Sequence, residues 1–288
     1  MSARDPRSLG PDDLVLCHFS LDRQHPLEDR IEAAAAAGLA GISVYLREYA
    51  RLAAAGLDAD RLAAMLEAHD LCLAELEVVR VWPASPEEAA REAASEQLAW
   101  ELADRFGCRY LQAIGPTPGE PEATVAGFAE LCDRAAEHGM VVGLEFLPFT
   151  DIVTAADALA IVEAADRPNG GVCVDIWHHT RGANDLDLIR AIPAGRVTGI
   201  QMSDGPLTQE LDSYYEDCLR RRVPPGEGEM DVVGFVAALL GAGVTVPWGL
   251  EVCQEAVWGQ PAAQHVRRSA DGMRSALTAA RGRLADGT

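Results

Sequence analysis

Lysine is absent from this 288-residue chain, so all 24 of its cationic side chains are arginines. Without a lysine amine, the chain cannot form a Schiff base, anchor pyridoxal phosphate or supply the lysine of a phosphate-binding P-loop. Long apolar runs are also absent, because no stretch reaches the roughly 18 apolar residues that a membrane-spanning helix needs. We therefore expect neither amine chemistry nor a membrane partner.

Positive charge is scarce, since 45 acidic side chains give a formal net charge of −21. A nucleic-acid groove needs clustered cations to neutralise phosphates, so we expect no nucleic-acid partner. The seven cysteines are dispersed and include no Cys-x-x-Cys pair, which is typical of reduced thiols rather than of a disulfide framework. Residues 1–13 are polar and lack the apolar core of a signal peptide, so we expect a cytoplasmic protein.

Eight short apolar segments alternate with helical segments along the whole chain. The apolar segments are 14–19, 41–46, 71–79, 109–114, 141–146, 171–176, 196–202 and 247–252. Strands that alternate with helices form βα units and a parallel sheet, and eight such units in this length predict an α/β fold of the (β/α)₈ TIM-barrel type. We expect one domain over residues 1–288, with a charged helical or loop insertion at 208–230. The helix of this insertion is predicted at 208–222, where it would cover the barrel mouth or contact a second subunit.

Polar side chains stand where four consecutive strands end. These residues are Glu145, Asp175, Gln201 and Glu251. Active sites of TIM barrels lie at the C-terminal ends of the strands, so the four side chains should converge. Three carboxylates without a cation would repel one another, and hard divalent cations prefer oxygen ligands. The pattern predicts a site for one divalent cation, Mn²⁺ or Mg²⁺ first, with Co²⁺ or Zn²⁺ as alternatives; the opposing interpretation is that each residue begins a solvated loop.

Five motifs resemble the xylose isomerase-like TIM barrels, also called the sugar phosphate isomerase/epimerase superfamily. They are GLEFLP (143–148), VDIWHHTR (174–181), IQMSD (200–204), PGEGE (225–229) and GLEV (249–252). The resemblance implies that Glu145, Asp175, Gln201 and Glu251 bind one metal, and that Glu145 and Glu251 exchange a proton with the substrate. Ketose 3-epimerases of this family carry histidine on the seventh strand, so Gln201 departs from their pattern.

Further side chains are expected to contact the substrate. The resemblance implies that His178 contacts a substrate hydroxyl or carbonyl, the alternative being a capping or core histidine. Asp151 lies where epimerases place a second substrate-binding carboxylate, or it caps the helix that follows. The other candidates are Arg181 and Arg222 for an anionic group, Trp177 as an aromatic wall, and His18 and Glu77 as residues that line the pocket.

Three functions remain open at this point. The first is a metal-dependent isomerase or epimerase that moves a proton on the enediolate of a sugar or keto-polyol. The alternative is a lyase on the same framework, such as an inosose or 3-dehydroshikimate dehydratase or an enzyme that cleaves C-glycosides or 3-keto-glycosides by elimination. The third, an endonuclease IV-like DNA-repair enzyme, needs many histidines and a basic face, which seven histidines and the acidic charge disfavour. The resemblance also suggests a homodimer or homotetramer.

Overall fold

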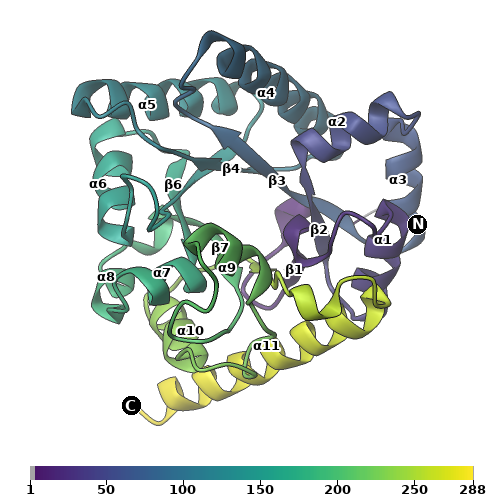
Figure 1. Ribbon diagram of the computed structural model, residues 1–288, viewed down its shortest axis with the longest axis vertical. Coiled ribbons are helices and arrows are strands. Elements are labelled where there is room, and N and C mark those ends of the chain that lie inside the picture. Colours follow the sequence, from purple (N-terminus) through teal and green to yellow (C-terminus); the bar gives the residue numbers. More distant parts are fainter. Residues whose placement is uncertain (1–3, 288) are drawn as a thin grey trace.

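The computed structural model describes residues 4–287, in which eight parallel strands close into a barrel in sequence order (Figure 1). The strands are β1 (Leu14–Leu16), β2 (Gly41–Tyr45), β3 (Cys72–Arg80), β4 (Tyr110–Ile114), β5 (Val141–Glu145), β6 (Gly170–Asp175), β7 (Val197–Met202) and β8 (Trp248–Leu250). Each strand pairs with its neighbours in the chain, and β8 pairs with β1 to close the ring. The predicted TIM barrel is therefore confirmed.

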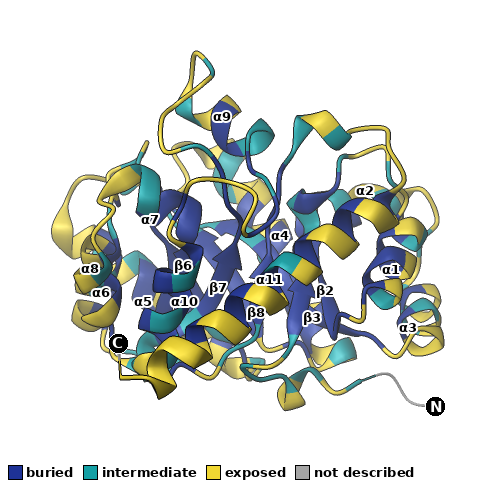
Figure 2. Ribbon diagram, turned by 90° about the horizontal axis from the view of Figure 1, so that it is seen from below, coloured by how far each residue is buried: buried dark blue, intermediate teal, exposed yellow. Residues whose placement is uncertain are grey.

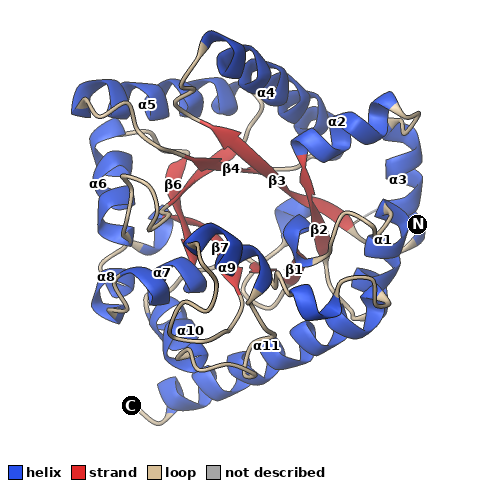
Figure 3. Ribbon diagram, viewed as in Figure 1, coloured by secondary structure: helices blue, strands red, loops and turns tan. Residues whose placement is uncertain are grey.

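Helices surround the strands as an outer layer, except α9, which lies over the barrel end (Figure 3). They are α1 (Leu27–Ala36), α2 (Leu46–Ala54), α3 (Ala59–Ala68), α4 (Pro86–Phe106), α5 (Pro121–Glu137), α6 (Ala155–Ala165), α7 (Ile176–Gly182), α8 (Leu186–Arg190), α9 (Tyr214–Arg220), α10 (Val232–Gly241) and α11 (Ala262–Ala285). Among residues 4–287, no helix combines the length and apolar character that a membrane span would require. All seven cysteines are buried and free.

Local sequence signals set many of these boundaries. Ser85 caps the N-terminus of α4 by accepting a hydrogen bond from the Glu88 backbone N–H, and Pro86 occupies the first turn. Gly107 ends the same helix at φ 70°, a left-handed conformation that glycine adopts without a steric penalty. Every residue of β6 is buried, which explains its continuous apolar pattern.

Two boundaries differ from the sequence-based prediction. The sequence predicts that the sixth strand reaches residue 176, but it ends at Asp175 and helix α7 follows at once. The Asp175 carboxylate accepts hydrogen bonds from the backbone N–H groups of Trp177 (2.6 Å) and His178 (3.4 Å), so it acts as the N-cap of α7. In the insertion, only Tyr214–Arg220 is helical, which is shorter than the helix expected over 208–222.

Tyr110 fills the barrel interior against two strands that carry glycine at the point of contact. A Cβ atom at Gly199 on β7 would lie 2.2 Å from the Tyr110 hydroxyl, and one at Gly143 on β5 would lie 2.5 Å from it. The Tyr110 side chain is buried, and its hydroxyl has no hydrogen-bond partner among the described residues. These glycines therefore make room for the aromatic ring.

We expect Gly199→Ala to lower the free energy of unfolding by about 1–3 kcal/mol, because the added methyl group overpacks the barrel interior. Urea denaturation of the purified chain measures this change. Gly282→Ala is the matched control, because a Cβ at this position in α11 meets nothing within 4 Å. The control should be neutral or more stable. A Gly199→Ala protein as stable as the control would contradict the packing described above.

Candidate active site

The four residues predicted from the strand ends stand at the C-terminal ends of β5, β6, β7 and β8, and all four are buried. Gln112 on β4, which the sequence analysis did not single out, connects two of them. Its Nε2 atom donates to Glu145 Oε2 at 2.8 Å, and the amides of Gln112 and Gln201 contact each other at 3.3 and 3.4 Å. Gln112 thus orients one carboxylate and one amide of the candidate site.

Arg222 connects the other two residues of this set. Its Nη1 atom lies 2.8 Å from Asp175 Oδ2 and 2.9 Å from Glu251 Oε2, and the side chain is buried. The Nε atom donates to the Cys218 carbonyl oxygen at 3.1 Å. The predicted position of Arg222 near the site is therefore correct, but its charge neutralises the carboxylates of the protein. In this structure it does not stand free for an anionic substrate group.

His178 faces the carboxylates from the first turn of α7. Its Nε2 atom lies 3.6 Å from Glu145 Oε1 and 3.7 Å from Asp175 Oδ2, whereas its Nδ1 atom lies 2.9 Å from the Tyr214 hydroxyl. Burial lowers the pKa of His178 to about 4, so the ring is neutral near pH 7. The carboxylates beside Nε2 favour a proton on that atom, with Nδ1 accepting from Tyr214.

The pKa values of the carboxyl groups show the mutual repulsion that the sequence predicts. Burial, followed by the charge of Asp175, raises the pKa of Glu145 to about 8. Burial also raises the pKa of Glu251 well above its usual range, although Arg222 opposes the shift. For Asp175, burial opposes ionisation, but the charge of Arg222, the neighbouring His178 and hydrogen bonds from Arg222 and Glu251 together lower the pKa. Negative charge on Glu145 therefore needs a further positive partner.

A divalent cation fits this donor set. Glu145 and Asp175 each place a carboxylate oxygen within 4.8 Å of the other and of a His178 ring nitrogen, and all three residues are buried. Within residues 4–287, Glu145 forms no ion pair with an arginine, whereas Arg222 pairs directly with Asp175 and Glu251. Carboxylate oxygens, with Gln201 nearby, are the ligands that Mg²⁺ and Mn²⁺ prefer.

Two predicted substrate contacts are corrected by the structure. Trp177 is fully buried, and two guanidinium groups lie over its ring. The distance from the guanidinium carbon to the ring centroid is 4.8 Å for Arg181 and 5.5 Å for Arg222. Trp177 therefore supports two arginines and is not an exposed aromatic wall of the mouth. Arg181 also has protein partners in place of an anionic substrate group. Its Nη2 atom lies 2.7 Å from Asp217 Oδ2, and its Nη1 atom donates to the Pro206 carbonyl oxygen at 3.0 Å.

Asp151 lies outside the buried cluster. Its exposed carboxylate accepts from the backbone N–H and the hydroxyl of Thr117 at 3.3 and 3.4 Å, so it links the loops that follow β4 and β5. The alternative prediction, that Asp151 caps the following helix, is wrong, because Thr154 caps α6 in a reciprocal pair with Asp157. Its substrate-binding role stays a prediction.

His18 and Glu77 lie on another side of the barrel, His18 shortly after β1 and Glu77 within β3. The backbone N–H of His18 donates to Ser43 Oγ at 2.7 Å, and the Ser43 hydroxyl donates to Glu77 Oε1. The His18 ring packs against Phe19 and Tyr45, with ring centroids 5.5 and 5.7 Å apart. Burial lowers the pKa of His18 to about 3 and raises that of Glu77 to about 7. Both residues are placed near the mouth, and their contact with substrate stays a prediction.

The insertion rises above this end of the barrel, where Figure 2 shows α9 at the top of the molecule. Besides the Tyr214 hydroxyl, Cys218 reaches the site, with its Sγ 4.0 Å from His178 Nε2. Asp217 is fully buried and accepts from two backbone N–H groups, at residues 210 and 211, as well as from Arg181. Helix α9 therefore covers the candidate site, as one of the two sequence-based alternatives expected.

Two curated relatives are similar in sequence, and both are 3-dehydroshikimate dehydratases. The chain is 32% identical over 160 residues to the one from Pseudomonas putida, a match that covers 55% of this chain and 24% of that protein. It is 27% identical over 262 residues to the one from Pseudomonas aeruginosa, which covers 87% of this chain and 39% of that protein. The chain thus spans well under half the length of these relatives.

Solved structures share the fold at lower identity. A xylose isomerase-like TIM barrel/4-hydroxyphenylpyruvate dioxygenase fusion protein aligns with a TM-score of 0.83 at 23% identity, covering 96% of this chain and 44% of that chain. The IOLI protein with a bound zinc atom aligns with a TM-score of 0.81 at 18% identity, and the alignment covers 92% of this chain and 98% of that chain. The family model described as "Xylose isomerase-like TIM barrel" matches residues 31–276. This chain belongs to the family of xylose isomerase-like TIM barrels.

Proposed function

We propose that this protein is a divalent-metal-dependent dehydratase, a lyase that removes water from 3-dehydroshikimate or a related cyclic β-hydroxy ketone. The observation that carries the proposal is the pair of buried carboxylates, Glu145 and Glu251, set around Asp175 and His178. Both curated relatives are dehydratases, which favours the lyase alternative over the isomerase or epimerase interpretation. The zinc atom bound to one solved relative supports a metal of some kind.

Dehydration of a β-hydroxy ketone requires two proton movements. A base removes the proton from the carbon between the ketone and the hydroxyl-bearing carbon, and the electron pair shifts to the ketone oxygen. The electrons then return to form a carbon–carbon double bond, while the hydroxyl leaves with an added proton as water. When bound by Glu145, Asp175, Gln201 and Glu251, a divalent cation would supply Lewis-acid stabilisation of the negative oxygen.

The contacts of the two glutamates suggest how they divide this work. Arg222 Nη1 holds Glu251 Oε2, so Glu251 Oε1 is the atom that accepts the substrate proton. Gln112 holds Glu145 Oε2, so Glu145 Oε1 is the atom that donates a proton to the leaving hydroxyl. Burial raises the pKa of both glutamates, so the position of the free oxygen of each carboxyl group carries this assignment. Neutral His178 would orient the substrate by donating from Nε2.

Turnover of candidate substrates tests the proposal. The full chain, stripped of metal and resupplied with Mn²⁺ or Mg²⁺, is incubated with 3-dehydroshikimate, inososes and ketohexoses, and products are separated by liquid chromatography. We expect metal-dependent loss of water and an aromatic acid from 3-dehydroshikimate, with no reaction after chelation. Epimerised ketohexoses together with intact 3-dehydroshikimate would overturn the lyase assignment in favour of the isomerase alternative.

A further inference from the structure

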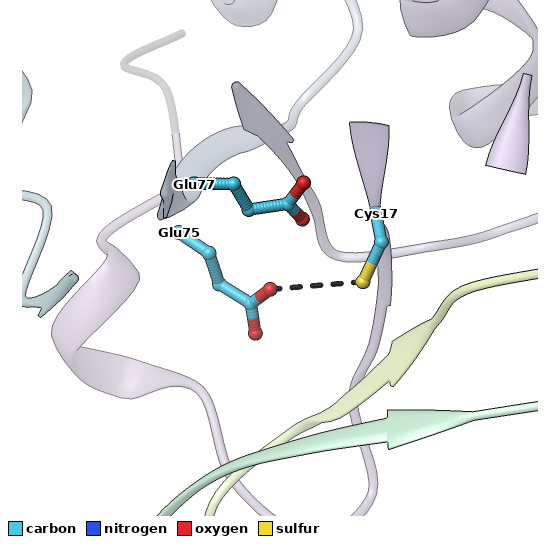
Figure 4. Close-up of side chains that lie close together, drawn as sticks. All are labelled: Cys17, Glu75 and Glu77. Atoms are coloured by element: carbon cyan, nitrogen blue, oxygen red, sulfur yellow. Dashed lines mark hydrogen bonds between the residues drawn. The ribbon is translucent and has the colours of Figure 1, made fainter. Parts of the chain in front are cut away.

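A second cluster of ligand-type side chains lies inside the barrel, between the end of β1 and strand β3 (Figure 4). It consists of Cys17, Glu75 and Glu77, whose donor atoms all lie within 4.8 Å of one another. The Cys17 sulfur is 3.8 Å from Glu75 Oε2, and Figure 4 shows both carboxylates extending from β3 toward that sulfur. All three side chains are buried, and none belongs to the set at the ends of β5–β8.

The polar atoms of this cluster are incompletely satisfied. Glu77 Oε1 accepts from Ser43, but Glu77 Oε2 is fully buried and has no hydrogen-bond partner among the described residues. None of the ion pairs within residues 4–287 includes Glu75 or Glu77, whereas Asp175 and Glu251 share Arg222. A buried carboxylate oxygen without a hydrogen-bond partner is costly, and a bound cation would supply the partner that Glu77 Oε2 lacks.

We propose that Cys17, Glu75 and Glu77 form a second cation site, suited to Zn²⁺ or a similar transition metal. Thiolate sulfur favours such ions over Mg²⁺ and Mn²⁺, which prefer oxygen ligands only. Zinc bonds of about 2.0–2.3 Å in a tetrahedron place ligand atoms roughly 3.5 Å apart. The 3.8 Å separation of the Cys17 and Glu75 donor atoms is close to this value. Three protein ligands leave a fourth position for water.

Ser43 completes the site as a positioning residue. Its hydroxyl accepts from the His18 backbone N–H and donates to Glu77 Oε1, which leaves Glu77 Oε2 without a hydrogen-bond partner. Outer partners of this kind fix the orientation of a ligand, and their loss typically weakens metal affinity about 10–100-fold. We therefore expect Ser43→Ala to weaken binding at the second site by that factor without changing the first.

Cobalt titration of the metal-free full chain tests the proposal, because Co²⁺ bound to thiolate gives a near-ultraviolet charge-transfer band that oxygen ligands do not give. We expect the band to form, to be displaced by Zn²⁺ and to withstand Mg²⁺. Cys17→Ser should abolish the band and one equivalent of bound cobalt. Cys132→Ser, which replaces a buried thiol in the outer helix α5, is the matched control. It should keep both the charge-transfer band and the bound cobalt.

Two further variants separate this site from the proposed active site. Glu75→Gln keeps the side-chain volume and should weaken the thiolate band. If Cys17→Ser folds poorly, this variant tests whether the second cation site exists. Glu145→Gln should lower metal binding at the first site and leave the band in place. A wild-type protein without the band, or a band that survives in Cys17→Ser, would overturn the second site. A band lost only in the Cys17 and Glu75 variants supports it even if 3-dehydroshikimate is not a substrate.

Discussion

Replacing Glu251 with glutamine is expected to lower turnover of 3-dehydroshikimate by about 10²–10⁴-fold, the usual contribution of a general base, while the barrel stays folded. The amide keeps the volume of the side chain and one oxygen that can accept from Arg222 Nη1. It cannot accept the substrate proton. Weakened metal binding would add to the loss, so the metal content of the variant has to be measured beside its rate.

Exchange of the substrate α-proton with solvent deuterium separates proton removal from expulsion of water. Glu251→Gln should suppress both exchange and product formation. His178→Ala should mainly raise KM with metal occupancy nearly unchanged, because His178 is proposed to orient substrate. Glu227→Gln is a control at an exposed ion pair with Arg268 and should keep wild-type turnover. Near wild-type activity of a metal-loaded Glu251→Gln protein would refute the proton-transfer mechanism.

Asp217→Asn should release the insertion from the barrel mouth. The Asp217 carboxylate is fully buried and pairs with Arg181, whose side chain is only 4% exposed. Removing one partner of a buried ion pair leaves the other charge uncompensated, which typically costs about 3–5 kcal/mol. Because the pair joins α7 to the insertion, we expect local opening of 206–222 with little loss of global stability. Turnover should fall as well, since Tyr214 and Arg222 leave His178 and the carboxylates.

Hydrogen–deuterium exchange with peptide resolution measures this opening. Amides of residues 206–222 should exchange faster in Asp217→Asn, while those of the barrel strands keep their protection. Glu216→Gln provides the matched control on the same helix, because its ion pair with Arg220 is partly exposed and 3.8 Å long. Equal protection of the insertion in both variants would argue against the role given to the Arg181–Asp217 pair.

Local patterns predicted the fold and the strand ends at which the candidate site residues stand. Eight apolar segments separated by helices suffice to define the barrel, and the topology then brings Glu145, Asp175, Gln201 and Glu251 to one end. Helix α7 was missed because the polar run after β6 resembles a loop. Only the hydrogen bonds from its first backbone N–H groups to Asp175 reveal the cap.

Contacts between distant residues could not be predicted from the sequence. Gln112 lies within an ordinary apolar strand, and its contact with Gln201 joins residues 89 positions apart. Arg181 and Arg222 were correctly placed near the mouth, but their acidic partners lie on other segments, so their charges had looked free. Trp177 follows a strand end, and the sequence does not say whether its ring turns to the mouth or inward beneath the arginines.

The sequence does not decide between the isomerase and the lyase interpretation, because this outcome also depends on the arrangement of distant segments. Both reactions begin with removal of a proton next to a carbonyl, and the same two glutamates would serve either of them. The outcome depends on whether a hydroxyl on the neighbouring carbon lies where a proton can reach it. That depends on the position of the substrate relative to Glu145 Oε1, a relation among several loops that strand-end motifs do not encode.

The position of bound manganese tests the central claim most directly. Crystals of the full chain soaked in Mn²⁺ would be measured for anomalous scattering at the manganese edge. The account predicts a strong peak at the barrel mouth, about 2.0–2.4 Å from oxygen atoms of Glu145, Asp175, Gln201 and Glu251. Absence of a peak there, with Arg222 still bound to Asp175 and Glu251 and Gln201 still paired with Gln112, would contradict it.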